Sequence, residues 1–245
     1  MMLTPRPYLQ QVSIRPDAEI DLDSYPYSIP AVREIGELTF HPDVTFFVGE
    51  NGAGKSTVLE GIAVALGYAP EGGTRNVRLS TTDSVSSLHE NLRLAHSFRK
   101  PKDGYFLRAE SFFNVATYMD EVGYLGGYGD RSLHERSHGE AFMALLTHKF
   151  RGNGLYLLDE PEAALSPNRQ LAALSAIHQL VQEESQFIIA THSPILLSYP
   201  NAKILLFDGS GISEVQYEDT EHFAVTRDFL NNYPRRLEQL LADEE

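Results

Sequence analysis

The sequence contains no cysteine and no tryptophan, and only four of its 245 residues are methionine. Without cysteine, neither a disulfide framework nor a thiolate-ligated metal site can form. No uninterrupted apolar run approaches the ~18 residues that a membrane-spanning helix requires. The first residues, Met-Met-Leu-Thr-Pro-Arg-Pro, lack the apolar core of a signal peptide. We therefore expect a cytoplasmic protein that does not itself insert into a membrane.

Basic residues are also scarce. The chain has 20 lysines and arginines against 34 aspartates and glutamates, which gives a formal net charge of −14. A field of that sign opposes non-specific binding to nucleic acid or anionic lipid, although a local basic groove can still act. Hydrophobic residues make up 42% of the chain, as in globular proteins with a packed core. The length suits one large domain, or one domain with an inserted subdomain.

The most informative stretch that is present is the glycine-rich segment Gly49–Thr57, with the sequence GENGAGKST. It follows the β-branched and aromatic run Val44–Val48 and precedes Val58–Leu66, whose apolar residues recur at helical spacing. The order strand, glycine-rich turn, helix is the context of a P-loop, whose pattern G-x-x-x-x-G-K-[ST] is met here. Backbone N–H groups and the helix N-terminus attract phosphate at such a loop. The residues predicted to bind nucleotide are Asn51, Gly52, Ala53, Gly54, Lys55, Ser56 and Thr57.

A second informative stretch is the apolar run Leu155–Leu158, which Asp159 and Glu160 follow directly. The run predicts a buried strand, and in an open α/β sheet the carboxyl end of a strand faces the ligand crevice. Asp159 would hold Mg²⁺ together with the hydroxyl of Ser56. Glu160 would orient or deprotonate an attacking water. Adjacent carboxylates repel each other unless a cation lies nearby, which favours a catalytic over a structural role.

Two further stretches complete the candidate site. Ser137 begins a predicted helix as its N-cap, with Glu140 three residues later, as in a capping box. His192 follows the apolar strand Gln186–Ala190, where it can hydrogen-bond a phosphate or the attacking water. A lone histidine is more often structural, but its position at a strand end beside the other motifs favours catalysis.

Other segments carry weaker signals. Residues 84–100 are predicted to be helical, because Val85, Leu88, Leu92 and Ala95 fall on one face. The segment Tyr25–Pro30 is interrupted by two prolines. Its aromatic rings either stack on a nucleotide base or, the alternative that the usual burial of such rings favours, hold a loop on the core. Residues 112–121 are predicted to form a helix, and residues 220–245 a charged helical segment interrupted at Pro234.

In order and spacing, these motifs resemble an ABC-type ATPase over residues 8–217. Gly49–Thr57 looks like Walker A, and Leu155–Glu160 looks like Walker B with its catalytic glutamate. The stretch 137–140, Ser-His-Gly-Glu, looks like the signature motif. Ala164-Leu165-Ser166 stands where the family has its D-loop, and His192 where it has its switch histidine. The resemblance is to the compact branch related to SMC and DNA-repair ATPases, without a coiled coil or a transmembrane domain.

The resemblance implies an α/β fold, a P-loop NTPase of ABC-ATPase type with a mixed central sheet, flanking helices and a small helical signature subdomain. A single domain would span residues 1–245, with the subdomain inserted at about 77–150 and a helical tail at 218–245. It also implies ATP and Mg²⁺ as cofactors and a head-to-tail homodimer formed with ATP. In that dimer, Ser137 and the N–H of Gly139 would bind the γ-phosphate held by the partner's Walker A.

The sequence departs from the family pattern in two places. His138 replaces the first signature glycine and Arg136 the usual leucine, which favours the SMC-like branch over transporter subunits. No Q-loop glutamine is present after Tyr105–Ala109. Glu110 or Ser111 occupies that place, so Glu110 is the candidate for the Q-loop contact to the metal.

The leading hypothesis is therefore a Mg-dependent ATPase that dimerises with nucleotide and acts as a switch on an unidentified protein partner. One alternative is the nucleotide-binding subunit of an ABC membrane transporter, and another is a nucleotide-gated binding module with little turnover. Nucleic-acid binding would need a local basic surface. The candidate basic residues are more simply explained as the solvated face of a helix. The residues concerned are Arg93, Arg99, Lys100 and Lys102.

Overall fold

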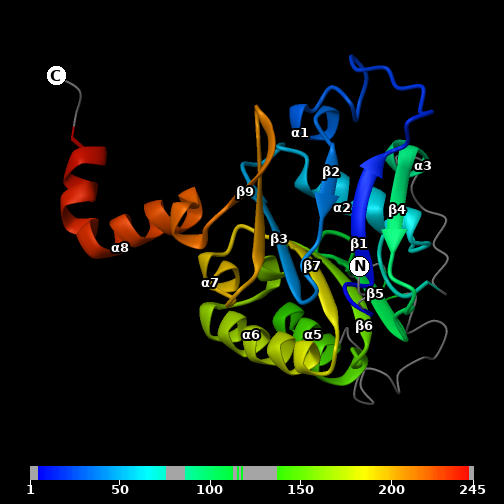
Figure 1. The fold of residues 1–245 in the computed structure, drawn as a ribbon. Helices are drawn as coiled ribbons and strands as arrows, with labels where there is room; N and C mark the ends of the chain where they lie inside the picture. The colour runs from blue at the N-terminus through cyan, green and yellow to red at the C-terminus, as the bar shows by residue number, and fades with distance from the viewer. Residues whose placement is uncertain (1–4, 76–85, 113–114, 116, 118–136, 243–245) are drawn as a thin grey trace.

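The computed structural model describes residues 5–75, 86–112, 115, 117 and 137–242. Its centre is a six-stranded sheet in the order β5-β6-β7-β3-β8-β9, accompanied by a three-stranded sheet in the order β2-β1-β4 (Figure 1). The strands of the central sheet are β3 (Val44–Gly49), β5 (Asp103–Arg108), β6 (Gly154–Asp159), β7 (Gln186–Ala190), β8 (Lys203–Asp208) and β9 (Gly211–Val215). Those of the small sheet are β1 (Leu9–Ile14), β2 (Glu37–Thr39) and β4 (Leu92–His96).

The central sheet is buried on both faces. Every residue of β3, β6 and β7 is buried, because parallel strands covered on both sides need apolar residues at successive positions. Side chains still alternate along each strand. In β6, Tyr156 and Leu158 join the core on one face, while Leu155 and Leu157 join the core on the other.

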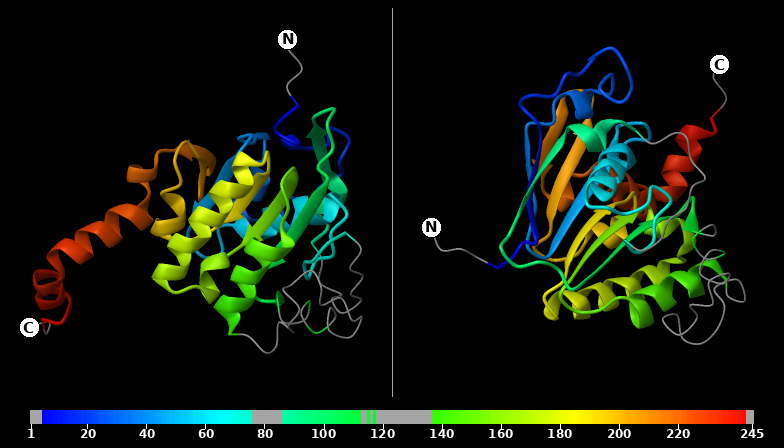
Figure 2. Two further views of the ribbon diagram at one scale, coloured as in Figure 1. Left: turned by 90° about the horizontal axis from the view of Figure 1, so that it is seen from below. Right: turned by 90° about the vertical axis from the view of Figure 1, so that its right-hand side faces the viewer.

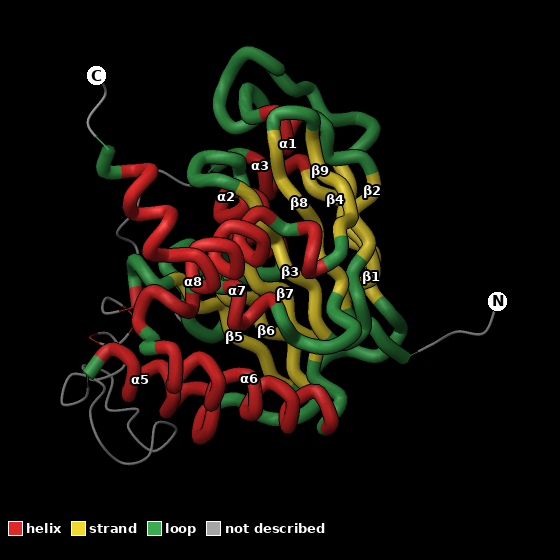
Figure 3. The backbone as a smooth tube through the Cα atoms, turned by 90° about the vertical axis from the view of Figure 1, so that its left-hand side faces the viewer, coloured by secondary structure: helices red, strands yellow, loops and turns green. Residues whose placement is uncertain are grey.

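Helices and the small sheet cover the two faces. One face packs against α5 (His138–Ala144), α6 (Pro167–Gln182) and α7 (Pro194–Leu197), and Figure 3 shows α5 and α6 along one side of the molecule. The other packs against α1 (Pro30–Arg33), α2 (Lys55–Ala65), α3 (Leu88–Asn91) and the antiparallel strands β1, β2 and β4. The predicted mixed central sheet with flanking helices is thus confirmed.

The strand directions assemble the site. Strands β5, β6, β7, β3 and β8 are all parallel, and only β9 runs antiparallel. Register pairs Asp159 with Ala190 and Phe47 with Ala190, so β3, β6 and β7 end at the same edge. The P-loop, the Asp159–Glu160 pair and the Thr191–His192 segment therefore leave the sheet side by side.

The helix predicted over residues 84–100 is wrong. The described part of that stretch forms a single turn, α3, and then the strand β4, which pairs antiparallel with β1 from Leu92 opposite Ile14. The apolar residues Leu92 and Leu94 alternate with Arg93 and turn toward the core that β1 shares. Pairing with a neighbouring strand thus overrode the helical spacing of the same residues.

The segment 77–150, predicted as a helical insertion, holds both β4 and β5 in addition to α5. Most of the predicted helix at 112–121 lies outside the described residues. The division into one domain with an inserted subdomain stays a prediction.

The last helix, α8 (Glu221–Leu240), follows a turn of 3₁₀ helix, Tyr217–Asp219, and projects from the body, as Figure 2 shows most clearly. None of its residues is buried. Its path bends at Asn232, whose φ and ψ are −127° and 19°, just before Pro234. Across the described ranges, no helix combines the length and the apolarity needed to span a bilayer.

Candidate functional site

The glycine-rich loop that follows β3 has the backbone of a phosphate-binding turn. Gly52 and Gly54 have φ values of 82° and 98°, in the left-handed region that favours glycine, and Gly54 is the N-cap of α2. At Gly49, a Cβ atom would lie 2.2 Å from the carbonyl oxygen of Phe207 in the adjacent strand β8. A side chain is excluded there because the two backbones approach too closely.

Lys55 lies in the first turn of α2 with its ammonium group turned back onto the loop. Its Nζ donates hydrogen bonds of 2.9 Å to the carbonyl oxygens of both Gly49 and Glu50. Burial lowers the pKa of Lys55, against the nearby carboxylates of Glu160, Asp159 and Glu162, which raise it. The ammonium group is thus held where the outer phosphates of a nucleotide would lie.

The Ser56 hydroxyl and the Asp159 carboxylate lie side by side. The Ser56 hydroxyl donates a 2.9 Å hydrogen bond to Asp159 Oδ1. Burial raises the pKa of Asp159 to about 6, against the hydrogen bond from Ser56 and the charge of Arg108, which lower it. Hydroxyl and carboxylate oxygens are ligands that Mg²⁺ prefers, so the residues present fit that ion.

Arg108 also lies close to this oxygen pair. It ends β5 in register with Asp159, and its Nε lies 4.0 Å from Asp159 Oδ2. Its guanidinium group also pairs with Glu60 on α2 and with Glu110, the latter at 3.5 Å. The Glu110 side chain is 82% exposed. The predicted metal contact of Glu110 stays a prediction, because in the structure this carboxylate faces Arg108 and solvent.

Glu160 and His192 face each other across the strand ends. Glu160 has a φ of 49°, which is uncommon for a residue other than glycine, asparagine or aspartate and marks a constrained backbone. Its Oε1 lies 3.7 Å from His192 Nε2. The backbone N–H of His192 donates to the buried carboxylate of Glu162, whose pKa is raised by burial. The 3₁₀ turn Pro161–Ala164 thereby joins the strand ends of β6 and β7.

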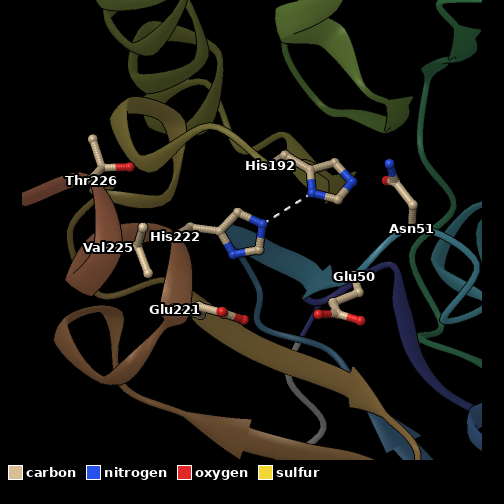
Figure 4. A pocket seen from close by; sticks show the side chains of 7 residues that line it. All are labelled: Glu50, Asn51, His192, Glu221, His222, Val225 and Thr226. Atoms are coloured by element: carbon tan, nitrogen blue, oxygen red, sulfur yellow. Dashed lines mark hydrogen bonds between the residues drawn. The ribbon is translucent and has the colours of Figure 1, made fainter. Parts of the chain in front are cut away.

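The second nitrogen of His192 contacts a residue that the sequence analysis missed. His192 Nδ1 lies 3.0 Å from His222 Nε2, in the first turn of α8, and the pair borders an open cavity of about 480 Å³ (Figure 4). Glu50, Asn51, Glu221, Val225 and Thr226 complete its lining. His222 belongs to no recognised motif. The only sequence signal near it is the start of the helical segment predicted over residues 220–245.

The segment before α1 packs on the P-loop. A Cβ atom at Gly54 would lie 2.9 Å from Cγ2 of Ile29. Tyr27 is buried in the core, as predicted for a ring that holds this loop. Tyr25 is 62% exposed, and its hydroxyl lies 3.5 Å from that of Thr57. Stacking on a nucleotide base stays a prediction, and Tyr25 is the ring placed for it.

Ser137 and Gly139 lie on α5. Ser137 caps the helix through the predicted capping box with Glu140, and Arg169 on α6 donates a 3.2 Å hydrogen bond to the Ser137 hydroxyl. A Cβ atom at Gly139 would lie 2.7 Å from the carbonyl oxygen of Ala164, in the segment that follows Asp159 and Glu160. Among the described residues, no hydrogen bond joins Ser137 to the P-loop of its own chain.

A lysine on a glycine-rich loop, a serine–aspartate oxygen pair and a buried parallel sheet define a P-loop NTPase. Comparison with known families agrees. Residues 28–117 match a family model described as "AAA domain", and residues 124–198 match one described as "AAA domain, putative AbiEii toxin, Type IV TA system". The chain belongs to the AAA/ABC-type P-loop ATPases.

Two curated relatives come from Methanothermobacter. A "Putative ABC transporter ATP-binding protein" of M. marburgensis is 27% identical over 77% of this chain and 74% of its own length. The energy-coupling factor transporter ATP-binding protein EcfA of M. thermautotrophicus is 28% identical over 78% of this chain and 67% of its own.

Solved structures show the same fold. The ATP-binding cassette MJ1267 of an ABC transporter aligns with a TM-score of 0.51 and 16% identity, over 97% of this chain and all of that one. The cbiO1 protein from Clostridium perfringens, part of the transporter complex cbiONQ, gives a TM-score of 0.50 and 14% identity, over 96% and 100%.

Proposed function

We propose that this ATPase binds ATP and Mg²⁺ at the interface of a head-to-tail dimer and acts as a nucleotide-driven switch on a protein partner. The observation that carries the proposal is the position of Ser137. Ser137 is the exposed N-cap of α5. Among the described residues, its side chain forms hydrogen bonds with Glu140 and Arg169 and none with the P-loop of its own chain. A signature serine in that position serves the γ-phosphate of a second copy.

Each residue of the site then has a role. The P-loop amides and Lys55 would bind the phosphates, and Ser56 with Asp159 would hold Mg²⁺, which neutralises charge on the phosphates when bound. Glu160 would position and deprotonate the attacking water, and His192 would hydrogen-bond the γ-phosphate. Because the partner's Ser137 contacts exist only with ATP in place, hydrolysis removes them and the dimer opens.

Gly139 supports this arrangement from within one chain. Its packing against the Ala164 carbonyl joins the start of α5 to the segment that follows Glu160. Movement of the signature helix in one copy is therefore transmitted to its own catalytic carboxylate.

The test is the mass in solution of a Glu160→Gln variant, with and without Mg-ATP, by light scattering. The substitution removes the general base, so kcat falls by about 10²- to 10⁴-fold while nucleotide binding is retained. We expect a monomer without nucleotide and a dimer with Mg-ATP.

Adding Ser137→Arg to that variant should abolish the dimer, whereas Ser175→Arg, on the exposed face of α6, should not. A mass that stays constant in every nucleotide state would contradict the sandwich, as would a dimer that tolerates Ser137→Arg.

A second candidate function is that of a transporter subunit, because both curated relatives carry names of transporter ATP-binding proteins. The absent Q-loop glutamine and the irregular signature argue against it. Co-purification of the tagged chain with an integral membrane protein would favour this alternative, and its recovery without one would favour the switch.

A further inference from the structure

The hydrogen bond between the two histidines has a direction that the surrounding charges determine. A neutral imidazole carries one N–H and one lone pair, so only one ring of the pair donates. Burial lowers the pKa of both His192 and His222, and nearby Lys55 lowers both further. The two rings are thus neutral near pH 7, and the tautomer of one fixes that of the other.

The carboxylate of Glu160 decides which ring donates. His192 Nε2 is buried, has no hydrogen-bond partner within the described residues, and lies 3.7 Å from Glu160 Oε1. If His192 donated from Nδ1, the lone pair on its Nε2 would face this carboxylate. If His222 donates from Nε2, His192 keeps its proton on Nε2 and presents an N–H to the carboxylate. Electrostatics favours the second arrangement.

The turn that carries His222 is attached to the segment that carries His192. The hydroxyl of Tyr217 donates a 2.8 Å hydrogen bond to the carbonyl oxygen of Pro194, two residues beyond His192. The Thr220 hydroxyl caps α8 by accepting from Phe223 N–H and donates to the Tyr217 carbonyl. The ring of Phe223 packs 4.7 Å from that of Tyr217. His222 therefore has a fixed position although the rest of α8 projects from the body.

We propose that His222 is a positioning residue for ATP hydrolysis: it donates its Nε2–H to His192 Nδ1 and so holds a proton on His192 Nε2, the atom that faces Glu160. The proposal rests on the role of His192 given above. It adds a residue from outside the known motifs, on the helix that leaves the domain. A histidine with the wrong tautomer would turn a lone pair toward the phosphate and repel it.

The first test needs no nucleotide, and it uses a variant only to assign the signal. In the ¹⁵N-labelled, nucleotide-free protein, the ring nitrogen shifts of His192 should report the Nε2–H tautomer, with the signal assigned by its loss in His192→Gln. A His192 ring protonated on Nδ1 would overturn the proposal, whatever the ATPase activity proves to be.

The second test separates positioning from packing. His222→Phe keeps a ring but removes the donor, and His222→Gln restores an N–H donor at a similar distance from the backbone. We expect kcat to fall by about 10- to 100-fold in His222→Phe, as for other residues that orient a functional histidine, and to recover in His222→Gln. The Kd for ATP should stay within about twofold of wild type in both, because His222 is assigned no contact with the phosphates.

His178 supplies the matched control. His178 lies on α6, and its Nδ1 lies 3.1 Å from the Tyr199 hydroxyl, so His178→Phe also removes a histidine hydrogen bond, but outside the site. Its kcat should equal that of wild type. If His222→Gln proves no better than His222→Phe, or His222→Phe hydrolyses ATP normally, the positioning role is wrong. A wild-type protein without ATPase activity would instead refute the role of His192, and the tautomer measurement would still decide the direction of the hydrogen bond.

Discussion

At the scale of single residues, the site depends on groups whose ionisation the fold alters. His192 and His222 have lowered pKa values, with burial as the largest cause in each case. In the unfolded chain both would titrate near pH 6.5. Below that pH the unfolded state binds more protons than the folded state, so the free energy of unfolding falls as pH falls. The stabilising contribution of the neutral pair is complete only above about pH 6.5.

We therefore predict that the wild-type protein loses more of its free energy of unfolding between pH 7.5 and pH 5.5 than His222→Gln does. The substitution removes one of the two histidines that resist protonation and leaves Lys55 and Glu221 in place. Urea unfolding of both proteins at the two pH values, in EDTA and without nucleotide, measures the difference. Equal losses in the two proteins would show that the pair does not contribute.

Several residues of the site could be predicted from the sequence because their chemistry depends on fixed spacing along the chain. Lys55 and Ser56 follow a glycine pattern, and Asp159 follows an apolar strand. Arg108 and His222 could not be predicted, because their partners are distant in sequence. Arg108 reaches Asp159 only through the register of two parallel strands, and His222 reaches His192 only through the turn at Tyr217.

At the scale of elements, the sequence predicted the buried strands correctly and failed at β4. Strands such as β6 are buried at every position and carry a short continuous apolar run, Leu155–Leu158, which is typical of a buried strand. In β4 the residues from Leu92 to His96 fit both a helical and an alternating pattern. Pairing with the edge of β1 favours the strand, because β1 supplies hydrogen bonds to β4 that a local sequence pattern does not reveal.

The helix α8 makes a prediction at this scale. It buries no residue, and its exposed side chains include Val225, Leu230, Tyr233 and Leu240. A helix of this length gains most of its stability from packing, and among the described residues the hydrogen bond that joins α8 to the body comes from His222 in its first turn. In the nucleotide-free protein we expect the amides beyond Asn232 to exchange with solvent as fast as unstructured peptide.

Hydrogen–deuterium exchange with mass spectrometry measures this profile. Peptides from β6 and β7 serve as the internal reference, because these strands are buried throughout and exchange only on larger openings. Strong protection of the segment beyond Asn232 in a monomeric sample would contradict the prediction, since it requires a contact that the structure lacks among the described residues.

At the scale of the whole molecule, the net charge of −14 limits the choice of partner. Of the basic residues considered for nucleic acid, Arg99 is paired with a carboxylate. Arg99 pairs with Glu184 at 2.8 Å, and the carboxylate raises the pKa of its guanidinium group. Arg93 lies on β4, exposed, in the three-stranded sheet. Long-range repulsion of the phosphate backbone is therefore only weakly opposed.

We predict that the Mg-ATP-bound Glu160→Gln protein binds a labelled DNA duplex no more tightly than about 10⁻⁴ M at physiological salt, the weak end of non-specific binding. Fluorescence anisotropy across a salt series measures this. A micromolar Kd whose logarithm falls linearly with that of the salt concentration would contradict the prediction and would assign several phosphate contacts to the protein.

The hydrogen bonds from Lys55 to Gly49 and Glu50 hold the lysine side chain against the backbone of the P-loop. The ammonium group that would meet the phosphates is thereby held in place, and it supplies a donor to both loop carbonyls. Nucleotide arrival is then a ligand exchange on one nitrogen, in which two carbonyl oxygens yield to phosphate oxygens. A receptor of this kind is preorganised, and little of its binding energy is lost in ordering the loop.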